Sequence, residues 1–295
     1  MKALKKRDYS FWGNMKKLKV KDVMNKNPPV AEVPGRREDV LHLFAKHSVS
    51  GLAVVKTGTR KFAGIVTRKD VFRNPEEDQL ALLMNKNPIT ISPNASIRTA
   101  AKIFYEKKIH GIPVVSKGRL VGVISPRDII RQISKLDGDI VEDYIGSPFV
   151  PIYEETPLPV VMKIFRITDM PALPVLGSNA KLVGIVTDGD LFNFSLVRES
   201  VDISNIGIGE DEDLWTWEGI RDIMRLHYET SKIELPEVAV KEVMIRNVIT
   251  VYKRERIGEV ARKMIENGID QMPVMDENNE MVGMIYDTDL MKALL

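Results

Sequence analysis

A seven-residue pattern occurs four times in this chain of 295 residues. Each copy begins with glycine, continues through two apolar residues and a hydroxyl-bearing residue, and ends on aspartate. The copies read GIVTRKD, GVISPRD, GIVTDGD and GMIYDTD, and they end at Asp70, Asp128, Asp190 and Asp289. Self-similarity of this kind marks a chain built from repeated structural units, so the sequence predicts four copies of one small fold.

Two further signatures accompany every copy in the same order. Each repeat opens with a short segment such as DVM (22–24), and a run such as GIPVV (111–115) precedes each seven-residue pattern. The closing aspartates are 58, 62 and 99 residues apart, which places an insertion between the third and fourth repeats. We therefore assign a basic tail to residues 1–19, the repeats to 20–76, 77–136, 137–195 and 238–295, and an acidic insertion with an amphipathic helix to 196–237.

Each repeat has the pattern of a β-α-β-β-α unit. A short apolar strand follows an Asn-Pro turn, and the helix after it has apolar residues at helical spacing, as at Ile97, Ala100, Ala101 and Phe104. Two apolar runs such as 112–115 and 120–124 then predict a hairpin. A unit of about 55 to 60 residues buries little apolar surface alone, so we expect an α/β (α+β) fold whose repeats associate in pairs.

This unit closely resembles the cystathionine beta-synthase (CBS) domain, whose marks are the Pro-Val-Val strand and the Gly-hydrophobic-hydrophobic-Thr-x-x-Asp pattern. The resemblance implies four CBS domains paired into two Bateman modules that form a disk, as in the gamma subunit of AMP-activated protein kinase. Members of the family commonly bind AMP, ADP, ATP or S-adenosylmethionine, whereas others bind nothing or regulate an attached enzyme or transporter. By this resemblance the chain is expected to be a ligand sensor and not an enzyme.

The end of each seven-residue pattern has the chemistry of a nucleotide site. A Thr or Ser at a strand end, followed by a helix start, offers a hydroxyl and backbone N–H groups to a phosphate. The aspartate three residues later can accept hydrogen bonds from both hydroxyls of a ribose. The same spacing also describes a capping box, which satisfies backbone donors without binding a ligand. Both roles stay open for every copy.

The charged residues around each copy of the pattern indicate which repeats are better suited to bind a nucleotide. In repeat two, Arg127 and His110 accompany Ser125 and Asp128, which makes it the best nucleotide site, and repeat one comes second. Repeats three and four carry carboxylates at Asp188, Asp270 and Asp287, which favour an uncharged or cationic ligand such as S-adenosylmethionine, or no ligand. The residues expected to bind nucleotide are Thr67, Lys69, Asp70, Thr90, His110, Gly111, Ser125, Arg127, Asp128, Thr187, Asp190 and Asp289.

The adenine pocket is placed by resemblance alone. Its walls are expected from the first strand of each repeat and from the residue that begins each Pro-Val-Val run. The candidates are Val30, Thr90, Val150 and Thr250, together with Gly51, Gly111, Ala172 and Gln271.

Charge is distributed unevenly along the chain. Lys plus Arg minus Asp plus Glu is +17 over residues 1–135 and −15 over residues 136–295. This asymmetry predicts an anionic ligand or partner for the first half, docking of one half on the other, or both. Nucleic acid is the alternative partner of the basic half, because Tyr9, Phe11 and Trp12 lie among the lysines of the tail and could stack on bases.

Composition excludes other classes of function. The chain has no cysteine, which rules out disulfides, cysteine-ligated metals and thiol chemistry. Its 4 histidines show no metal-ligand spacing, and no catalytic motif is present, so we expect neither a metal site nor catalysis. No apolar run is long enough to cross a membrane and no signal core is seen, so a cytoplasmic location is expected.

Together these observations predict an adenine-nucleotide sensor that acts on an unidentified protein partner. It would bind AMP, ADP or ATP as a ligand and require no cofactor. Sensing of S-adenosylmethionine, nucleic-acid binding by the basic half and assembly into a homodimer stay open.

Overall fold

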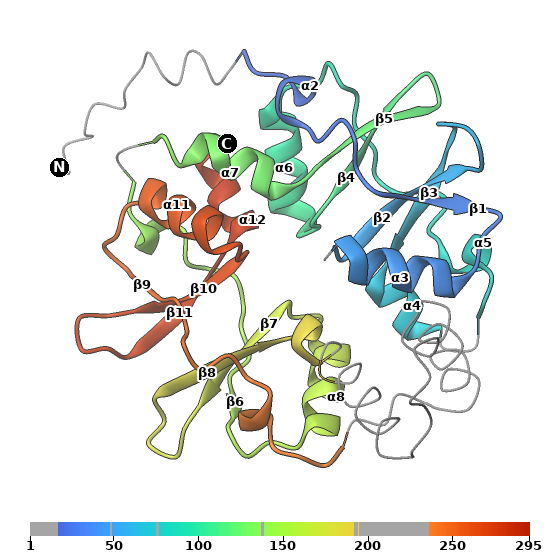
Figure 1. The fold of residues 1–295 in the computed structure, drawn as a ribbon. Coiled ribbons are helices and arrows are strands. Elements are labelled where there is room, and N and C mark those ends of the chain that lie inside the picture. Colours follow the sequence, from blue (N-terminus) through green and yellow to red (C-terminus); the bar gives the residue numbers. More distant parts are fainter. Residues whose placement is uncertain (1–16, 48, 75–76, 137–138, 192–193, 195–235) are drawn as a thin grey trace, which may run out of the picture. The chain divides into compact units, whose positions relative to one another are not determined.

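The computed structural model describes residues 17–47, 49–74, 77–136, 139–191, 194 and 236–295. The basic tail and the acidic insertion expected from the sequence lie almost entirely outside these residues. The chain forms two compact units, which are described separately (Figure 1). Unit one contains Met1–Tyr144, Arg254–Asp270 and Tyr286–Leu295, and unit two contains Ile145–Lys253 and Gln271–Ile285.

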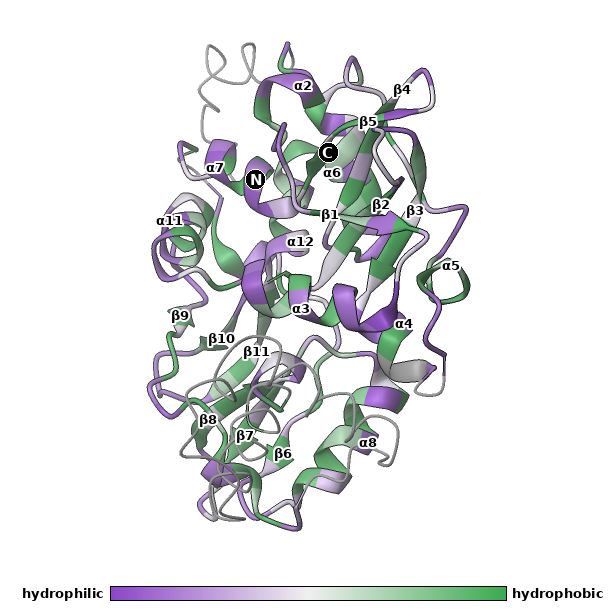
Figure 2. Cartoon of the chain, turned by 45° about the vertical axis from the view of Figure 1, so that its right-hand side comes forward, coloured by the Kyte–Doolittle hydropathy of each residue, from purple (hydrophilic) through white to green (hydrophobic). Residues whose placement is uncertain are grey.

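Repeat one has the predicted β-α-β-β-α order. Its elements are helix α2 (Val20–Val23), strand β1 (Val30–Val33), helix α3 (Arg37–His47), strands β2 (Gly51–Lys56) and β3 (Phe62–Thr67), and helix α4 (Arg68–Arg73). Strand β1 pairs in parallel with β2, and β2 pairs antiparallel with β3. A parallel pair needs a crossover connection, which α3 supplies while it buries Val40, Leu41 and Phe44. Figure 2 shows hydrophobic residues along β2 and β3, whose side chains form the core of this repeat.

Repeat two repeats this arrangement with a shorter first strand. Its elements are α5 (Leu80–Leu83), α6 (Ile97–Lys107), β4 (Ile112–Ser116), β5 (Arg119–Ile124) and α7 (Pro126–Ile133). Ile91 forms a single parallel bridge with Val114 in place of the first strand. The hairpin of β4 and β5 buries Ile112, Val114 and Ile124, as the apolar runs predict.

Repeats three and four follow the same order. Repeat three has the 3-10 helix η1 (Val141–Asp143), β6 (Ile152–Tyr153), α8 (Leu158–Thr168), β7 (Ala172–Leu176) and β8 (Leu182–Thr187), after which residues 188–191 are helical. Repeat four has η3 (Val240–Glu242), β9 (Val251–Tyr252), α11 (Ile257–Asn267), β10 (Gln271–Met275), β11 (Met281–Tyr286), α12 (Asp287–Leu290) and η4 (Met291–Leu294). In unit two the strands form two sheets, in the orders β6-β7-β8 and β11-β10-β9.

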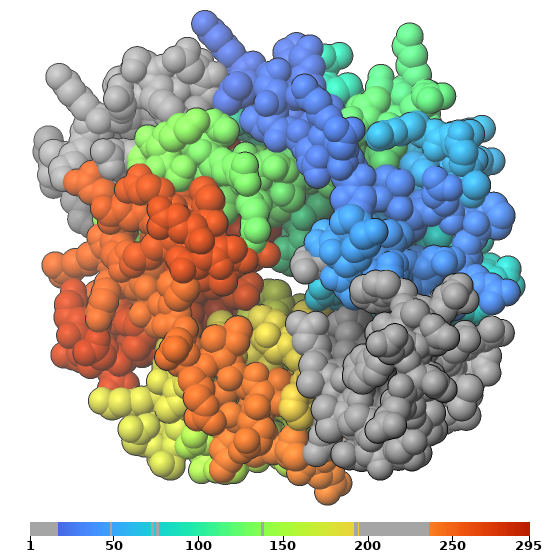
Figure 3. All heavy atoms as spheres, viewed as in Figure 1, coloured from blue at the N-terminus to red at the C-terminus, as the bar shows by residue number. Residues whose placement is uncertain are grey.

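Helices α11, α12 and η4 of repeat four belong to unit one, where they pack on the helices of repeat two. Helix α11 packs against α7, and η4 packs against α6. Figure 3 shows the green atoms of α7 beside the orange atoms of α11. Both helices bury apolar side chains, such as Ile129 and Ile133 of α7 and Val260 and Met264 of α11. The compact units therefore do not coincide with the basic and acidic halves of the sequence.

The opening segments of repeats one, two and four each pair with a strand of a neighbouring repeat. In unit one, Asn25 and Val123 exchange two backbone hydrogen bonds of 2.9 and 3.0 Å, and Asn85 and Ile65 exchange two of 2.8 and 3.0 Å. In unit two, Ile245 forms the same bridge with Ile185. Repeat one is thus paired with repeat two, and repeat three with repeat four, as the sequence predicts for units too small to be stable alone.

Candidate functional site

Strand registers bring the predicted residues of repeat two to one end of its sheet. Ile112 pairs with Ile124, so the preceding Gly111 and the following Ser125 flank the same end of the hairpin. Ile91 pairs with Val114, which places Thr90 at this end too. Helix α7 begins here and carries Arg127 and Asp128.

A capping box joins the hydroxyl residue and the aspartate in repeats one to three. In repeat two, the backbone N–H and the hydroxyl of Ser125 donate to Oδ2 of Asp128 at 2.8 and 2.9 Å. The same bonds join Thr67 to Asp70 at 2.8 and 2.6 Å, and Thr187 to Asp190 at 2.8 and 2.7 Å. The capping interpretation is therefore confirmed for these three copies.

The cap uses only one oxygen of each carboxylate. Within the described part of the chain, all hydrogen bonds that the side chains of Asp70, Asp128 and Asp190 accept go to Oδ2. The three aspartates are half-buried, and their other oxygen, Oδ1, is not among the buried side-chain atoms that lack a partner, so it is accessible to a ligand. Capping and ligand binding are thus compatible at one side chain.

The helix starts offer fewer free N–H donors than the sequence predicts. In repeat one, the Arg68 N–H donates to the carbonyl of Ser50 at 3.0 Å, and the Asp70 N–H donates to Oγ1 of Thr67 at 3.3 Å. In repeat two, Pro126 has no N–H to donate, and the Asp128 N–H lies 3.2 Å from the carbonyl of Ser125. Part of the backbone donor set that the sequence offers to a phosphate is therefore engaged within the protein at these two helix starts.

Burial raises the pKa of Asp128 above its ordinary value of 3.8. The hydrogen bonds from Ser125 and the positive charges of Arg131 and Arg127 lower this pKa, but they do not offset the cost of desolvation. This carboxylate is therefore short of donors, and additional hydroxyl donors at its Oδ1 would stabilise the charged form.

The other predicted residues of repeats one and two are partly exposed. Thr67 is half-buried beside Asp70, whereas Lys69 is exposed on α4. In repeat two, His110 and Thr90 are exposed, and Gly111 is half-buried. These positions are accessible at the sheet ends where α4 and α7 begin.

Repeat three has the same backbone arrangement with different charges. Ala172 pairs with Thr187 at the end of the β7–β8 hairpin, as Gly51 pairs with Thr67 in repeat one. Asp188 is exposed in the first helical turn, next to the capped Asp190. Repeat three therefore presents an anionic surface where repeats one and two present cations.

Strand pairing corrects one position in the expected adenine pocket. Ile152 pairs with Val175 in repeat three as Ile91 pairs with Val114 in repeat two. Pro151, and not Val150, is therefore the counterpart of Thr90. The prediction was one residue off because repeat three has three residues between Pro148 and Ile152, whereas repeat two has two between Pro88 and Ile91. Val30 and Thr250 keep their predicted places, since Ala31 pairs with Val54 and Val251 with Val274.

Repeat four places its copy of the pattern in a different environment. Tyr286, Asp287, Thr288 and Asp289 are all buried. Oδ1 of Asp289 accepts a bond of 2.6 Å from Nζ of Lys108, and Oδ2 accepts a bond of 3.0 Å from the N–H of Tyr286. Both oxygens of Asp289 are thus engaged within the protein. Gln271, which was expected to line an adenine pocket, is half-buried at the start of β10.

Two ion pairs connect repeat four to the cations of repeat two. Nζ of Lys108 pairs with Asp289, and Nη2 of Arg127 lies 3.1 Å from Oδ1 of Asp270. Sequence reasoning identified Arg127 but missed Lys108 as a partner of Asp289. No local signal could have revealed this pair, because its members are 181 residues apart.

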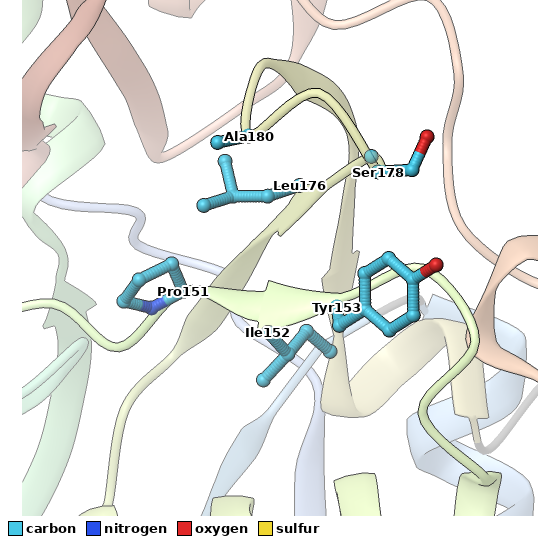
Figure 4. Close-up of a pocket in the computed structure, with 7 residues that line it drawn as sticks. Pro151, Ile152, Tyr153, Leu176, Ser178 and Ala180 are labelled. Carbon is cyan, nitrogen blue, oxygen red and sulfur yellow. The ribbon is translucent and has the colours of Figure 1, made fainter.

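A shallow hollow of about 410 Å³ lies elsewhere on repeat three. Figure 4 shows it at the turn of the β7–β8 hairpin, lined by Pro151, Ile152, Tyr153, Leu176, Gly177, Ser178 and Ala180. Thr187 and Asp190 lie at the opposite end of this hairpin, since Leu176 pairs with Leu182 and Ala172 with Thr187. The hollow therefore contains none of the predicted nucleotide-binding residues.

The described ranges contain neither a metal-binding group of side chains nor a helix that could span a membrane. Among these residues, no three His, Asp or Glu side chains are grouped so that they could hold a metal ion. None of the helices described there is both long enough and apolar enough to cross a bilayer.

Comparison with known proteins agrees with this architecture. The CBS domain family model matches residues 20–77, 79–135, 141–196 and 240–295. Protein MJ1225 of Methanocaldococcus jannaschii is 28% identical over 265 residues, which cover 82% of this chain and 86% of the relative. Its solved structure, of a candidate archaeal homologue of the AMP-activated protein kinase gamma subunit, covers 94% of this chain and 100% of its own, at 24% identity and a TM-score of 0.73.

A structure of a conserved protein from Pyrococcus horikoshii also covers 94% of this chain and 100% of its own, at 26% identity and a TM-score of 0.64. The fold is thus shared over nearly the whole length of these archaeal proteins. Since the family model matches four segments that together make up most of the sequence, the chain belongs to the CBS domain family.

Proposed function

We propose that this chain is a cytoplasmic regulatory protein that binds an adenine nucleotide, AMP, ADP or ATP, at repeat two and relays its occupancy to a protein partner. The observation that carries the proposal is the arrangement of Asp128. This carboxylate caps α7 through Oδ2 and keeps Oδ1 accessible, at the sheet end where Thr90, Gly111 and Ser125 meet.

The charges at this sheet end suit a nucleotide. A ribose diol would supply the donors that Oδ1 of Asp128 lacks, and its hydrogen bonds would favour the ionised carboxylate. Arg127 precedes Asp128 on α7, and His110 precedes Gly111, so both side chains lie next to residues of this sheet end. A guanidinium is well suited to a phosphate because it can donate two parallel hydrogen bonds to it.

Repeat one is proposed as a second nucleotide site, with Thr67, Lys69 and Asp70 in the corresponding roles. Repeat three keeps Thr187 and Asp190, but its Asp188 would repel a phosphate, so an uncharged or cationic adenosyl compound such as S-adenosylmethionine suits it better. Asp289 of repeat four is left out of the proposed ligand set because Lys108 and the Tyr286 N–H already engage both of its oxygens.

The test is Asp128→Asn, which separates capping from binding. The asparagine oxygen can still accept the Ser125 bonds, while the amide presents a donor in place of Oδ1. We expect nucleotide affinity, measured by calorimetry, to fall by about ten- to a hundredfold, which corresponds to about 1.5 to 3 kcal/mol for hydrogen bonds to a charged group. The free energy of unfolding should change by less than about 1 kcal/mol.

Asp190→Asn is the matched control, because it alters the same cap in repeat three without touching repeat two. It should leave the affinity of the repeat-two site unchanged. The proposal is wrong if wild-type protein binds none of the three nucleotides at millimolar concentration, or if Asp128→Asn binds them as tightly as wild type. Binding of RNA or DNA in their place, with an affinity that falls steeply with salt, would assign the basic half to nucleic acid.

A further inference from the structure

The guanidinium proposed to bind phosphate is already paired with a carboxylate in the structure. Nη2 of Arg127 lies 3.1 Å from Oδ1 of Asp270. The two side chains are 39% and 44% exposed, so water reaches the pair and an incoming anion can as well. Asp270 belongs to repeat four, and it is 143 residues away from Arg127 in the sequence.

Asp270 is held in place by the start of α12. Its carbonyl accepts a hydrogen bond of 2.8 Å from the N–H of Asp287. The Asp287 side chain is buried, with 2% of the residue exposed, and its Oδ1 has no hydrogen-bond partner in the described structure. The neighbouring Asp289 is paired with Lys108. Three carboxylates of repeat four are therefore arranged around two cations of repeat two.

We propose that Asp270 is an internal competitor of the nucleotide phosphate for Arg127. The inference rests on the proposed function and adds its regulation. In the ligand-free protein Arg127 pairs with Asp270, and in the bound protein it pairs with the phosphate. Asp270 then remains close to the phosphate without its counter-charge, so it weakens the binding of phosphorylated ligands.

The exchange is energetically accessible because the pair is half-exposed. Ion pairs of this kind contribute little to stability, and a phosphate offers Arg127 a greater negative charge and a bidentate geometry. Releasing Asp270 costs affinity for two reasons, since the ion pair is lost and the free carboxylate repels the phosphate. Removing the charge of Asp270 should therefore tighten nucleotide binding.

The position of Asp270 also indicates how occupancy could be transmitted. Asp270 follows α11 after two residues, and α11 packs against α7, the helix that carries Arg127. When Arg127 leaves Asp270 and pairs with the phosphate, an ion pair beside the α7–α11 contact is thus lost. Within unit one, nucleotide binding at repeat two would alter its contact with the helices of repeat four.

The experiment compares Asp270→Asn with wild-type full-length protein by calorimetric titration with ATP and with adenosine. We expect ATP to bind about three- to tenfold more tightly to Asp270→Asn, which is the change expected for an exposed charge near a phosphate. Adenosine has no phosphate, so its affinity should be unchanged. Glu277→Gln is the matched control, because it removes one exposed carboxylate of repeat four that pairs with Lys253 at 3.4 Å, and it should not change ATP affinity.

The gain should also depend on Arg127. In an Arg127→Ala background, Asp270→Asn should improve ATP affinity by less than it does in wild type. Equal ATP affinity in Asp270→Asn and wild type overturns this inference while leaving the proposed function intact, and so does an equal gain for adenosine. Absence of ATP binding in both proteins overturns the proposed function and the inference together, whereas binding by Asp270→Asn alone supports both.

Discussion

The carbonyl oxygen of Asn25 lies 2.6 Å from the position that a Cβ atom on Gly122 would occupy. Gly122 is the glycine that begins the seven-residue pattern of repeat two, and Asn25 belongs to the opening segment of repeat one. The corresponding glycines of repeats three and four also lie close to their paired repeats, but there a Cβ would meet a side chain, that of Met244 at Gly184 and that of Ile145 at Gly283. The glycine of the pattern therefore serves the pairing of repeats, because it allows the opening segment of the partner to approach the strand.

Substitution of this glycine should weaken the pairing. We expect Gly122→Ala to lower the free energy of unfolding by about 1 to 3 kcal/mol, because the added methyl group meets backbone that must shift. Gly111→Ala is the control in the same repeat, since its Cβ would come no closer than 3.8 Å to a neighbour. Chemical denaturation measures both variants. A Gly122→Ala protein as stable as wild type would show that the close approach is not needed.

Most of the fold could be predicted from the sequence because its signals are local and occur four times. The apolar spacing of Ile97, Ala100, Ala101 and Phe104 predicts one buried helix face, and all four residues are buried in α6. The packing of α11 on α7 could not be predicted, because the residues that meet there are far apart in the sequence. The place of Val150 was predicted one residue off, because only the register of β6 with β7 shows which residue of repeat three precedes the paired strand.

The candidate site was predictable in its residue types but not in their pairing. The spacing of Ser125 and Asp128 predicts a cap and a carboxylate at the same sheet end, and the structure shows both. The pairs of Arg127 with Asp270 and of Lys108 with Asp289 depend on tertiary structure. Charge patterning indicated only that the two halves have opposite charge.

The pair of Lys108 with Asp289 should contribute more to stability than an exposed ion pair. The Asp289 side chain is 4% exposed, so loss of the ammonium group would remove an ion-pair partner from a buried carboxylate. We expect Lys108→Met to lower the free energy of unfolding by about 1 to 2 kcal/mol, less than for a fully buried pair because Lys108 is itself 45% exposed. Lys102→Met removes an exposed partner of Glu106 and should cost under about 0.5 kcal/mol. Equal effects of the two substitutions would contradict this prediction.

Tyr286 carries a hydroxyl group whose removal should stabilise the protein. Its Oη is buried and has no hydrogen-bond partner in the described structure. Tyr286→Phe should raise the free energy of unfolding by about 1 kcal/mol, since a buried polar group without a partner is removed. A loss of stability would indicate a hidden partner for the hydroxyl.

The same burial raises the pKa of Tyr286 to about 12, with a smaller contribution from the charge of Asp289. The folded protein therefore keeps this proton longer than the unfolded chain, whose tyrosines ionise near pH 10. The stability that the neutral phenol contributes should be present below about pH 10 and lost as the pH rises through about 12. Ultraviolet titration of phenolate in wild type and Tyr286→Phe measures this difference directly.

Asp287 should make the stability of unit one fall as the pH rises. Burial raises the pKa of this carboxyl group well above its ordinary value of 3.8, and the charges of Asp270 and Asp289 raise it further. The folded protein therefore binds one more proton than the unfolded chain at pH values between the two pKa values. The contribution of Asp287 to the free energy of unfolding is greatest below pH 3.8 and is lost as the pH rises through the folded pKa.

Asp287→Asn removes this titration, so the variant should be more stable than wild type at pH 7, by about 1 to 3 kcal/mol, because folding of the wild type must either take up a proton or bury a poorly compensated charge. The difference between the two proteins should shrink as the pH falls toward 4, because Asp287 then binds its proton in the unfolded chain as well. Asp276→Asn is the informative comparison, since hydrogen bonds from Glu280 and Asn278 lower the pKa of Asp276 and its removal should instead destabilise the protein at pH 7. Denaturation curves between pH 4 and pH 7 measure the free energy of unfolding of each protein. If the difference between Asp287→Asn and wild type does not change with pH, the pKa of Asp287 is not raised by folding.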